Sequence, residues 1–521
     1  MSSSTELLVS MPSITLSYPL LPTRPQFLSH TSSCMDTSLE ISPLPNLSLE
    51  RLSSELIALV LEQLREIDSH TLTSVRLVSK RFDAIATPIF YRYLALNERL
   101  IVQDAQWRYP NAFHHISRFT NHVTVRSNLE PGGIAGVLSH VRRLKSVRTQ
   151  LYIDNLPLRR DMIEVDAMLD VFTESIPAKF LTSLKLANTT PVLSTRLNSL
   201  KRLLIEASRL STLQYEDRGQ GTCFNFLPKE RMPALTDLRL RSYDWRHTAE
   251  DVRKHWDFSR IQSLELVSVP IFNFLSSVCF QDFSRLHTLH AEDYSAHLSD
   301  KREDATAGLN ILVKDHIKAL ETLNITCHTE LFQMDAITAH QHSLQVLRFR
   351  DHVGFSEDDQ KCPTLAPDNL LGLSQHLKRV HTLELDMDVR LCDPAAFLRA
   401  ICAFPSIHTL TLHVPTMIQP LEEIPPGIDR DYEAAIRTFK LLLQEKERLG
   451  AHTPWRHIAV NVGGWKRVMV RRLGGVWRRR NEMGIYAERC FVLERDAQNG
   501  KVGVREEVCV ENTSRGGSPT P

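Results

Sequence analysis

An apolar–x–x–apolar–x–apolar phrase that returns eight times is the feature that most constrains how this chain can fold. The copies begin at Leu181, Leu235, Ile261, Leu286, Leu320, Leu344, Val380 and Ile407. Successive copies mostly lie about 24–29 residues apart, and two intervals stretch to roughly 35. The last two apolar positions of each copy alternate with a polar one, which places them on one face of a short β-strand.

The segments between the copies are long enough for a helix, and those at 309–320 and 394–404 are amphipathic. A strand and a helix that recur at this period are typical of a leucine-rich-repeat-like solenoid, in which each unit buries its apolar face against its neighbours. We therefore predict an α/β solenoid over residues 97–430. The alternative is a set of unrelated α/β segments that share a common Leu-x-Leu strand.

Length and composition narrow the class of protein. A chain of 521 residues is too long for one ordinary core, and 42% hydrophobic and 24% charged residues are normal for a globular protein. A formal net charge of +1 gives no global attraction to nucleic acid or to an anionic membrane. No apolar stretch approaches the length of a membrane span, and the nine cysteines are scattered without a CxxC pair. These features predict reduced thiols and a cytoplasmic or nuclear protein that does not bind a membrane.

The N-terminal region changes character near residue 47. Residues 1–46 are rich in Ser, Thr and Pro and show no helical or strand period, so we predict a disordered lead-in. Apolar residues then recur at helical spacing from 49 to 64 and again from 72 to 82. We predict three short helices in residues 47–96, which are too small to bury their apolar faces without a partner or a neighbouring domain.

The ends of these helices can be placed from single residues. Ser53 or Ser54 can cap the first helix, and Asp68 can cap the second. Pro88 either stops the second helical segment or begins a third.

The C-terminal residues 431–511 break the repeat. Residues 432–449 predict one charged amphipathic helix that ends at Gly450, and 458–462 predict a strand. Two further apolar segments, 490–493 and 502–508, flank an Asn499-Gly500 pair that favours a β-hairpin. We therefore predict a helix and hairpin that cap the solenoid, followed by a disordered tail at 512–521.

Residues 47–96 resemble the F-box family, particularly its fungal members. The resemblance is carried by Leu52-Ser-Ser-Glu-Leu56-Ile57, by Leu72-Thr-Ser-Val75-Arg76-Leu77-Val78-Ser79-Lys80-Arg81-Phe82 and by the following Ala86–Arg92. Ser53 stands where family members usually have proline. An F-box followed by irregular leucine-rich repeats is a common arrangement. The expected architecture is thus an α+β multi-domain chain: a three-helix F-box, an α/β leucine-rich-repeat-like solenoid and a strand and hairpin cap.

The resemblance implies a function without catalytic residues. F-box proteins bind the Skp adaptor of a Skp–cullin–F-box ubiquitin ligase and select a protein substrate with the rest of the chain, while other subunits transfer ubiquitin. The adaptor-binding residues implied here are Leu52, Leu56, Ile57, Val60, Leu64, Leu72, Val75, Val78 and Phe82. About a third of them should pack internally rather than bind.

The substrate should lie on the strand side of the solenoid or on its loops, such as those at 354–368 and 415–431. The alternative to a ligase receptor is an adaptor-bound scaffold that recruits no cullin.

Motifs of enzymes and metal sites are missing from the sequence. We find no HExxH, GxSxG, phosphate-loop or kinase signature, so we expect no enzymatic activity and no cofactor. The glycine-rich stretch 131–136 lacks dinucleotide-loop spacing and predicts a plain turn. Close His and Cys pairs, Cys327-His328 and His340 with His342, have no second pair at a spacing that suits zinc, so we assign no metal.

A basic run near the C-terminus is the one concentrated charge feature. Its candidate phosphate-binding residues, flanked by Trp465 and interrupted by Trp477, are Lys466, Arg467, Arg471, Arg472, Arg478, Arg479 and Arg480. They suit a phosphorylated substrate peptide, or a phosphate- or nucleic-acid-binding repeat protein as a third hypothesis. The competing interpretation is a solvated helix face whose tryptophans and valines pack inward.

Overall fold

A computed structural model describes most of the chain between residues 52 and 507. The described residues are 52–68, 70–152, 165–187, 198–216, 223–293, 301–351, 364–414, 430–450, 453–462, 489–495 and 502–507. The chain separates into two compact units, residues 1–57 and 58–521, and the boundary falls inside the first helix.

The helices follow one another along the whole described chain. They are α1 (Ser54–Ile67), α2 (Thr71–Val75), α3 (Lys80–Arg92), α4 (Glu98–Ile101), α5 (Ala105–Arg108), α6 (Pro110–Phe119), α7 (Pro131–His140), α8 (Val165–Glu174), α9 (Asn198–Glu206), α10 (Ala249–His255), α11 (Ile271–Ser277), α12 (Arg302–Ile311), α13 (Met334–Thr338), α14 (Pro367–His376), α15 (Pro394–Cys402) and α16 (Arg430–Arg448). Short 3-10 helices η3 (Ala178–Phe180) and η4 (Phe280–Phe283) and a π-helix η6 (Leu312–His316) accompany them.

The strands form one sheet within the second unit, in strict sequence order. They are β1 (Tyr93–Ala95), β2 (His122–Arg126), β3 (Ser146–Tyr152), β4 (Leu181–Ala187), β5 (Thr212–Glu216), β6 (Asp237–Arg241), β7 (Ser263–Val269), β8 (Thr288–Asp293), β9 (Thr322–Cys327), β10 (Val346–Asp351), β11 (Thr382–Asp386), β12 (Thr409–Val414), β13 (His457–Val462), β14 (Arg489–Arg495) and β15 (Val502–Glu507). Strands β1 to β13 are parallel, and β14 and β15 join antiparallel.

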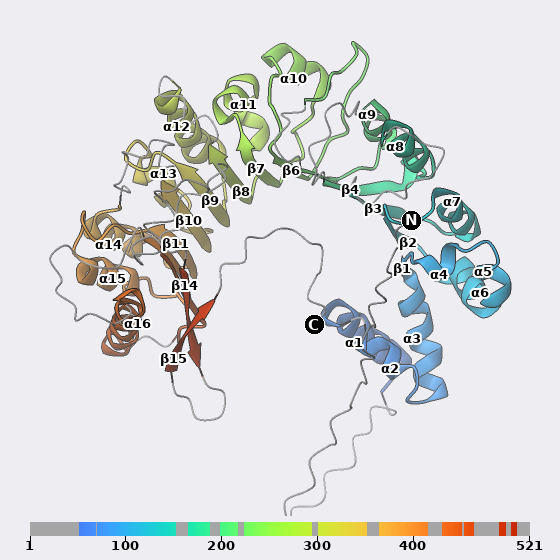
Figure 1. Ribbon diagram of the computed structural model, residues 1–521, viewed down its shortest axis with the longest axis horizontal. Coiled ribbons are helices and arrows are strands. Elements are labelled where there is room, and N and C mark those ends of the chain that lie inside the picture. The colour runs from blue at the N-terminus through green and yellow to red at the C-terminus, as the bar shows by residue number, and fades with distance from the viewer. Residues whose placement is uncertain are drawn as a thin grey trace, which may run out of the picture. The chain divides into compact units, whose positions relative to one another are not determined.

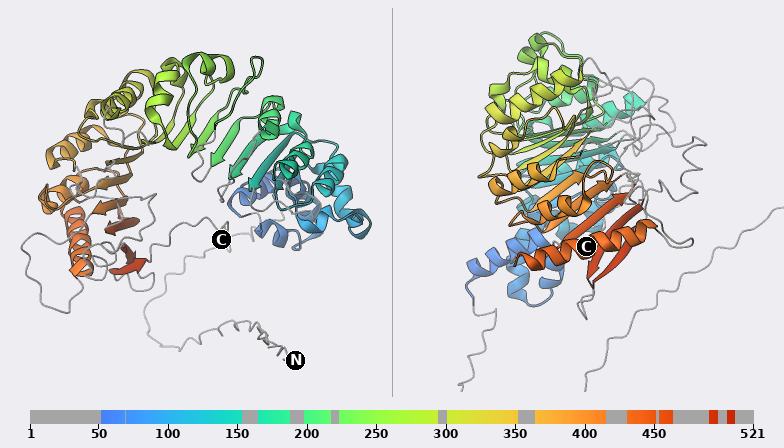
Figure 2. Two further views of the ribbon diagram at one scale, coloured as in Figure 1. Left: turned by 45° about the horizontal axis from the view of Figure 1, so that its top comes forward. Right: turned by 90° about the vertical axis from the view of Figure 1, so that its left-hand side faces the viewer.

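The sheet and the helices form two layers. Helices α7 to α16 lie along one side of the sheet, and the opposite side carries no helix of the described repeats (Figures 1 and 2). Side chains alternate accordingly: in β9, Leu323 and Ile325 are buried while Thr322 and Asn324 are half-buried. The core therefore runs between sheet and helices from repeat to repeat, as a solenoid requires.

The eight sequence phrases supply β4 and β6 to β12, so the predicted α/β solenoid is confirmed. Four strands escaped the pattern: β1, β2, β3 and β5. β5 fills the long gap between the first two phrases, and its last apolar position is Tyr215 rather than an aliphatic residue. In β3 the same position is a buried threonine, Thr149. Both side chains fill the core, but neither belongs to the Leu/Ile/Val pattern that defined the phrase.

Helices α1, α2 and α3 lie between residues 54 and 92, and their boundaries differ from those that the sequence suggested. The sequence allowed either Ser53 or Ser54 to cap α1. The Ser53 hydroxyl accepts the Leu56 N–H at 3.3 Å, so Ser53 is the cap. The predicted second helical stripe is divided, because Ser79 is extended and its hydroxyl accepts the Phe82 N–H at 3.3 Å. Pro88 consequently lies inside α3, and neither predicted role for it is right.

The predicted turn at residues 131–136 is also wrong, because these residues begin α7. The Glu130 carboxylate accepts the Gly133 N–H at 2.6 Å and thereby caps the helix. A Cβ on Gly133 would come within 2.8 Å of the Ile101 Cβ, so glycine permits close packing against α4.

The C-terminal cap has the predicted form. Helix α16 is followed by Gly450 with a φ of 61°, β13 extends the parallel sheet, and β14 and β15 form an antiparallel pair. The Asn499-Gly500 turn lies outside the described residues. Among the described helices, none is long and apolar enough to cross a membrane.

Candidate protein-interaction sites

The nine predicted adaptor-binding residues fall into three groups by exposure. Leu56, Val60 and Val78 are exposed by 51%, 55% and 66%. Buried side chains are Ile57, Leu72 and Phe82, and half-buried ones are Leu52, Leu64 and Val75. Three of the nine are thus buried in the structure. Their role in binding an adaptor stays a prediction.

Exposed apolar side chains concentrate in this part of the chain. Of the 16 large hydrophobic residues that are exposed in the described chain, six lie between residues 56 and 78: Leu56, Leu59, Val60, Ile67, Leu77 and Val78. Leu77 and Ile67 reach 85% and 80% exposure. Contiguous exposed apolar surface is uncommon on isolated soluble proteins and marks interaction sites.

The sequence analysis had left Leu59, Ile67 and Leu77 out of the adaptor-binding set. Helix α1 carries two apolar stripes, because Ile57 and Leu61 are buried at 3% exposure each while Leu59 is exposed by 59%. A helix that is apolar on more than one face needs a second surface to bury it. The second stripe could have been recognised from its own three- and four-residue spacing.

Polar contacts hold the helices of residues 58–95 in position. Arg92 donates to the Glu62 carboxylate at 2.6 Å, and Arg76 donates to the Asp83 carboxylate at 2.9 Å. Hydrogen bonds from Arg76 and then Thr87 lower the pKa of Asp83. The Arg65 guanidinium lies 3.9 Å from the Tyr93 ring centroid, which ties α1 to the start of the sheet.

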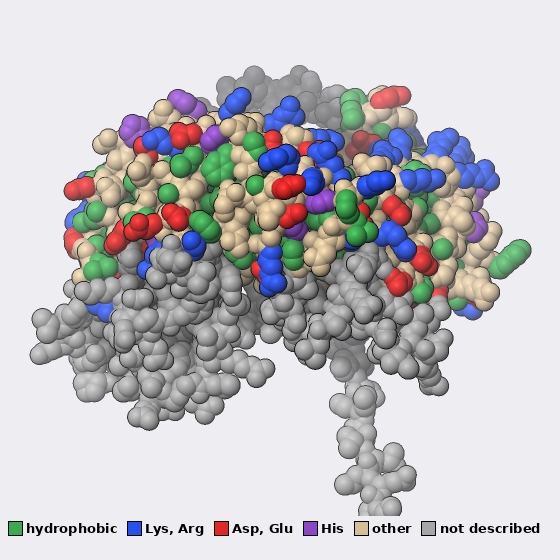
Figure 3. Space-filling model, turned by 90° about the horizontal axis from the view of Figure 1, so that it is seen from above, with side chains coloured by type: hydrophobic (Ala, Val, Ile, Leu, Met, Phe, Trp, Pro, Cys, Tyr) green, Lys and Arg blue, Asp and Glu red, His purple; other side chains and the backbone are tan. Residues whose placement is uncertain are grey.

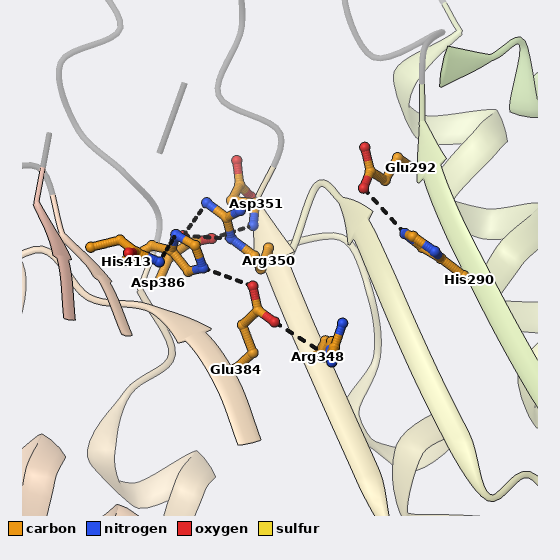
Figure 4. A network of polar contacts seen from close by, with 9 residues as sticks. His290, Glu292, Arg348, Arg350, Asp351, Glu384, Asp386 and His413 are labelled. Carbon is orange, nitrogen blue, oxygen red and sulfur yellow. Dashed lines mark hydrogen bonds and ion pairs between the residues drawn. The ribbon is translucent and has the colours of Figure 1, made fainter. Parts of the chain in front are cut away.

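The helix-free face of the sheet offers a second candidate site, made of charged and polar side chains. Glu265, His290, Asn324, Arg348 and Glu384 lie side by side in register across β7 to β11. Figure 4 shows two groups of polar contacts on these strands: the His290–Glu292 pair, and a separate group that includes Arg348, Glu384, His413, Arg350, Asp351 and Asp386.

The Arg350–Asp386 pair is the most buried part of the second group. Arg350 Nε and Nη2 donate to one Asp386 oxygen at 3.1 and 3.0 Å, and the Asp351 N–H donates to the other at 2.8 Å. The Asp351 carboxylate in turn accepts the N–H and hydroxyl of Thr329, both at 2.9 Å. Burial, followed by repulsion from Asp386 and Glu330, raises the pKa of Asp351 to about 6 despite these hydrogen bonds.

Glu384 is held between two cationic side chains and a histidine. Arg348 Nε lies 3.3 Å from one oxygen and His413 Nε2 lies 2.7 Å from the other. Burial opposes ionisation, but the hydrogen bond from His413 and the charges of Arg350 and Arg348 lower the pKa of Glu384 to about 2. Burial and then Arg350 lower the pKa of His413, so we assign a neutral imidazole that donates Nε2–H to an ionised carboxylate.

His290 has the reverse arrangement to Glu384, because it is a basic side chain that lies between two carboxylates. Its Nε2 lies 3.1 Å from Glu292 and its Nδ1 lies 3.8 Å from Glu265 (Figure 4 draws the Glu292 contact). Burial disfavours the charged ring, but hydrogen bonds to Glu265 and Glu292 outweigh it and raise the pKa of His290. Burial likewise opposes ionisation of Glu265, but His290 and Arg241, whose Nη2 lies 2.6 Å away, lower its pKa to about 2.

These contacts make the helix-free face a fixed pattern of charges. Glu265 and Glu384 stay ionised at neutral pH, and each is oriented by partners on neighbouring strands. Such a surface is suited to recognise a complementary protein surface, because its charged groups are ordered before a partner arrives.

Other predicted site residues are placed less fully. The basic run Lys466 to Arg480 lies outside the described residues, as do most of the loops at 354–368 and 415–431. His340 is a core residue, since its Nε2 contacts the Val313 carbonyl at 2.8 Å. In the described part of the chain, no three His, Cys, Asp or Glu side chains are grouped so that they could hold a metal ion.

Fold and sites together define an α/β solenoid with an exposed apolar N-terminal region and a charged strand face. No family model matches the chain, and no curated protein matches it. Among solved structures, it is similar to the leucine-rich repeat-containing protein LegL7 from Legionella pneumophila, with 11% identity over 67% of this chain and 89% of that chain. The TM-score of 0.23 is too low for that likeness to support a statement about fold or function.

Proposed function

We propose that the chain is the substrate-recognition subunit of a Skp–cullin–F-box ubiquitin ligase. Residues 52–92 would bind the Skp adaptor, and the solenoid would bind the protein substrate on its charged strand face. The observation that carries the proposal is the group of exposed apolar side chains between Leu56 and Val78, in the segment that resembles an F-box. Apolar anchors on short helices are a common means of docking into a partner's groove.

The charged strand face supports the substrate half of the proposal. Its ion pairs join different strands, so the face is rigid, and rigid repeat surfaces serve as extended binding surfaces for proteins. Recognition without catalysis is sufficient for such a subunit, because transfer of ubiquitin belongs to other subunits of the ligase.

Co-purification with the Skp adaptor tests the first half. The Leu56→Asp, Val78→Asp double variant places charges at two exposed apolar positions, so it should fold normally and lose the adaptor. We expect at least about a thirtyfold increase in Kd, as for the loss of an interface hot spot. Thermal unfolding and circular dichroism of both proteins check that the variant keeps its fold.

A matched control is the Leu371→Asp, Leu391→Asp double variant, which changes leucines exposed by 41% and 45% on the solenoid. It should bind the adaptor as the wild type does. Absence of wild-type binding, or equal loss in both double variants, would contradict the proposal. Pull-down of a cullin with the wild-type complex then separates a ligase receptor from a scaffold that binds only the adaptor.

A further inference from the structure

The turn that precedes each parallel strand carries a regular backbone pattern. The residue before the strand donates its N–H to the corresponding carbonyl of the preceding repeat, as Gln262 does to Thr236 and His287 to Gln262, both at 2.8 Å. These hydrogen bonds form a ladder that extends the sheet by one residue at the edge where the parallel strands begin. It therefore sets residues of successive turns about 4.8 Å apart, at the strand spacing.

Five repeats place an arginine at one position of this turn, two residues before the ladder residue. We call these residues the arginine row: Arg143, Arg209, Arg260, Arg285 and Arg379. All five are exposed, and each is followed by an apolar residue that points into the core, as Ile261 and Leu286 do with at most 1% exposure. The alternation explains why the side chain before the apolar residue must face solvent.

The guanidinium groups of the arginine row form no ion pairs with other described residues. Among the described residues, no carboxylate lies within 4.0 Å of any of the five guanidinium groups. Among the described residues, Arg379 is the one member of the row that makes a polar contact, to the His342 carbonyl at 2.8 Å. Lys145, Lys179 and Lys318 add exposed cations in turns of the same edge. Figure 3 shows Lys and Arg side chains gathered along the upper margin on the right, over α7 to α9.

Helix dipoles explain only part of this pattern. Helices end at the edge where the strands begin, and a cation near a helix C-terminus is favourable. That effect acts anywhere in the last turn of a helix. It does not require arginine at one position relative to the strand ladder, or the absence of carboxylate partners.

The spacing of the row suits an extended polypeptide. From β3 to β8, five strand spacings span about 24 Å, which equals roughly seven residues of extended chain. Single-stranded nucleic acid fits less well, because it is held by aromatic stacking as well as by cations. Between residues 119 and 320, no Phe, Tyr or Trp side chain of the described chain is exposed. The formal net charge of +1 also gives little long-range attraction to a polyanion.

We propose that four members of the arginine row, Arg143, Arg209, Arg260 and Arg285, bind an acidic, extended segment of a partner protein, which lies across the turns that precede β3 to β8. This surface is separate from the F-box-like helices, and the proposal holds whether or not the chain binds a Skp adaptor. The guanidinium forks would pair with Asp and Glu carboxylates of the segment.

Fluorescence anisotropy of the full chain with a labelled peptide tests the proposal. The probe has alternating Glu and Ser over about ten residues, enough to cross the turns that precede β3 to β8. We expect saturable binding that weakens as salt rises, because the contacts are exposed ion pairs. The same peptide with Gln in place of Glu should not bind.

Charge reversal locates the site. In the Arg260→Glu, Arg285→Glu variant, Kd for the Glu peptide should rise about tenfold or more. Arg437→Glu with Lys440→Glu makes the same change in net charge on exposed positions of α16 and should leave Kd unchanged. Arg209→Gln with Arg285→Gln replaces the first variant if charge reversal alters thermal unfolding.

Three results would overturn the proposal: no binding of the Glu peptide by the wild type at low salt, equal weakening in the α16 control, or tighter binding of duplex RNA than of the peptide at matched salt. Tighter binding of single-stranded RNA than of the peptide at matched salt would likewise overturn the proposal, and either nucleic-acid result would assign the edge to nucleic acid instead. Adaptor co-purification is measured separately, so failure of either proposal leaves the other intact.

Discussion

At the scale of single residues, the sheet handles buried charge by pairing it across strands. Arg350 and Asp386 are exposed by 8% and 5%, and the hydrogen bonds from Arg350 and from the Asp351 N–H to the Asp386 carboxylate join two neighbouring strands. An unpaired ion at this depth would cost several kcal/mol. Neither residue stood out in the sequence, because their partners are about 36 residues away along the chain and become neighbours only through the register.

Asp351 is the residue whose protonation should affect stability most visibly. Its pKa is about 6 in the fold against 3.8 for the ordinary carboxyl, so the folded chain holds the proton more tightly than the unfolded chain. The carboxyl therefore contributes stability below pH 4 that is lost as the pH rises to 6. Asp351→Asn keeps an oxygen for Thr329 and should raise the free energy of unfolding at pH 7.5 by about 1–3 kcal/mol.

Urea unfolding at several pH values checks this prediction. The gain from Asp351→Asn should shrink as the pH is lowered from 7.5 toward 4, since the wild-type carboxyl is then protonated in the fold. Asp304→Asn, on the exposed face of α12, is the control for the exchange of a carboxyl for an amide. A constant difference between wild type and Asp351→Asn across this pH range would contradict the assignment.

At the scale of elements, side-chain caps decide where the helices begin. Ser53, Ser79 and Glu130 each accept a backbone N–H at the start of their helix. Because the cap at Ser79 divides the second apolar stripe, periodicity alone predicted one helix where there are two. Local hydrogen bonds thus override the spacing of apolar residues at a boundary, although not along the length of a helix.

Helix α10 offers the clearest test of a cap. The Thr248 hydroxyl accepts the Asp251 N–H at 3.2 Å, and the Asp251 carboxylate accepts the Thr248 N–H at 3.0 Å, which together form a capping box. Thr248→Ala should lower the free energy of unfolding by about 1 kcal/mol. Chemical denaturation measures this loss of stability. The control is Thr338→Ala at the end of α13, where the threonine caps no helix. Equal losses in the two variants would show that the capping box adds nothing.

At the scale of the molecule, each strand of the solenoid is stabilised by its immediate neighbours. β9 pairs only with β8 and β10, and its Leu323 and Ile325 are fully buried. In such an architecture the effects of a local change should spread to adjacent repeats and fade beyond them.

Leu323→Ala tests this neighbour-by-neighbour stability. Loss of a fully buried leucine should lower the free energy of unfolding by about 2–5 kcal/mol. Hydrogen exchange followed by mass spectrometry should show reduced protection mainly in β8 to β10, with β3 and β12 little changed. Leu331→Ala, at a leucine exposed by 43%, is the control. A uniform loss of protection over the whole sheet would mean that the solenoid unfolds as one cooperative unit.

The sequence by itself determined the α/β repeat and the C-terminal helix and strands. It could do so because burial against a neighbouring repeat requires alternating aliphatic residues at a regular period, and this pattern can be recognised within each short segment of the sequence. Strands in which Thr149 or Tyr215 takes the aliphatic place were missed for the same reason. Only the tertiary structure decided which of Ile57 and Val60 faces solvent, which carboxylate meets Arg350, and that five distant arginines share one edge. Those properties depend on the register between repeats, and register is a relation between segments rather than a property of any one of them.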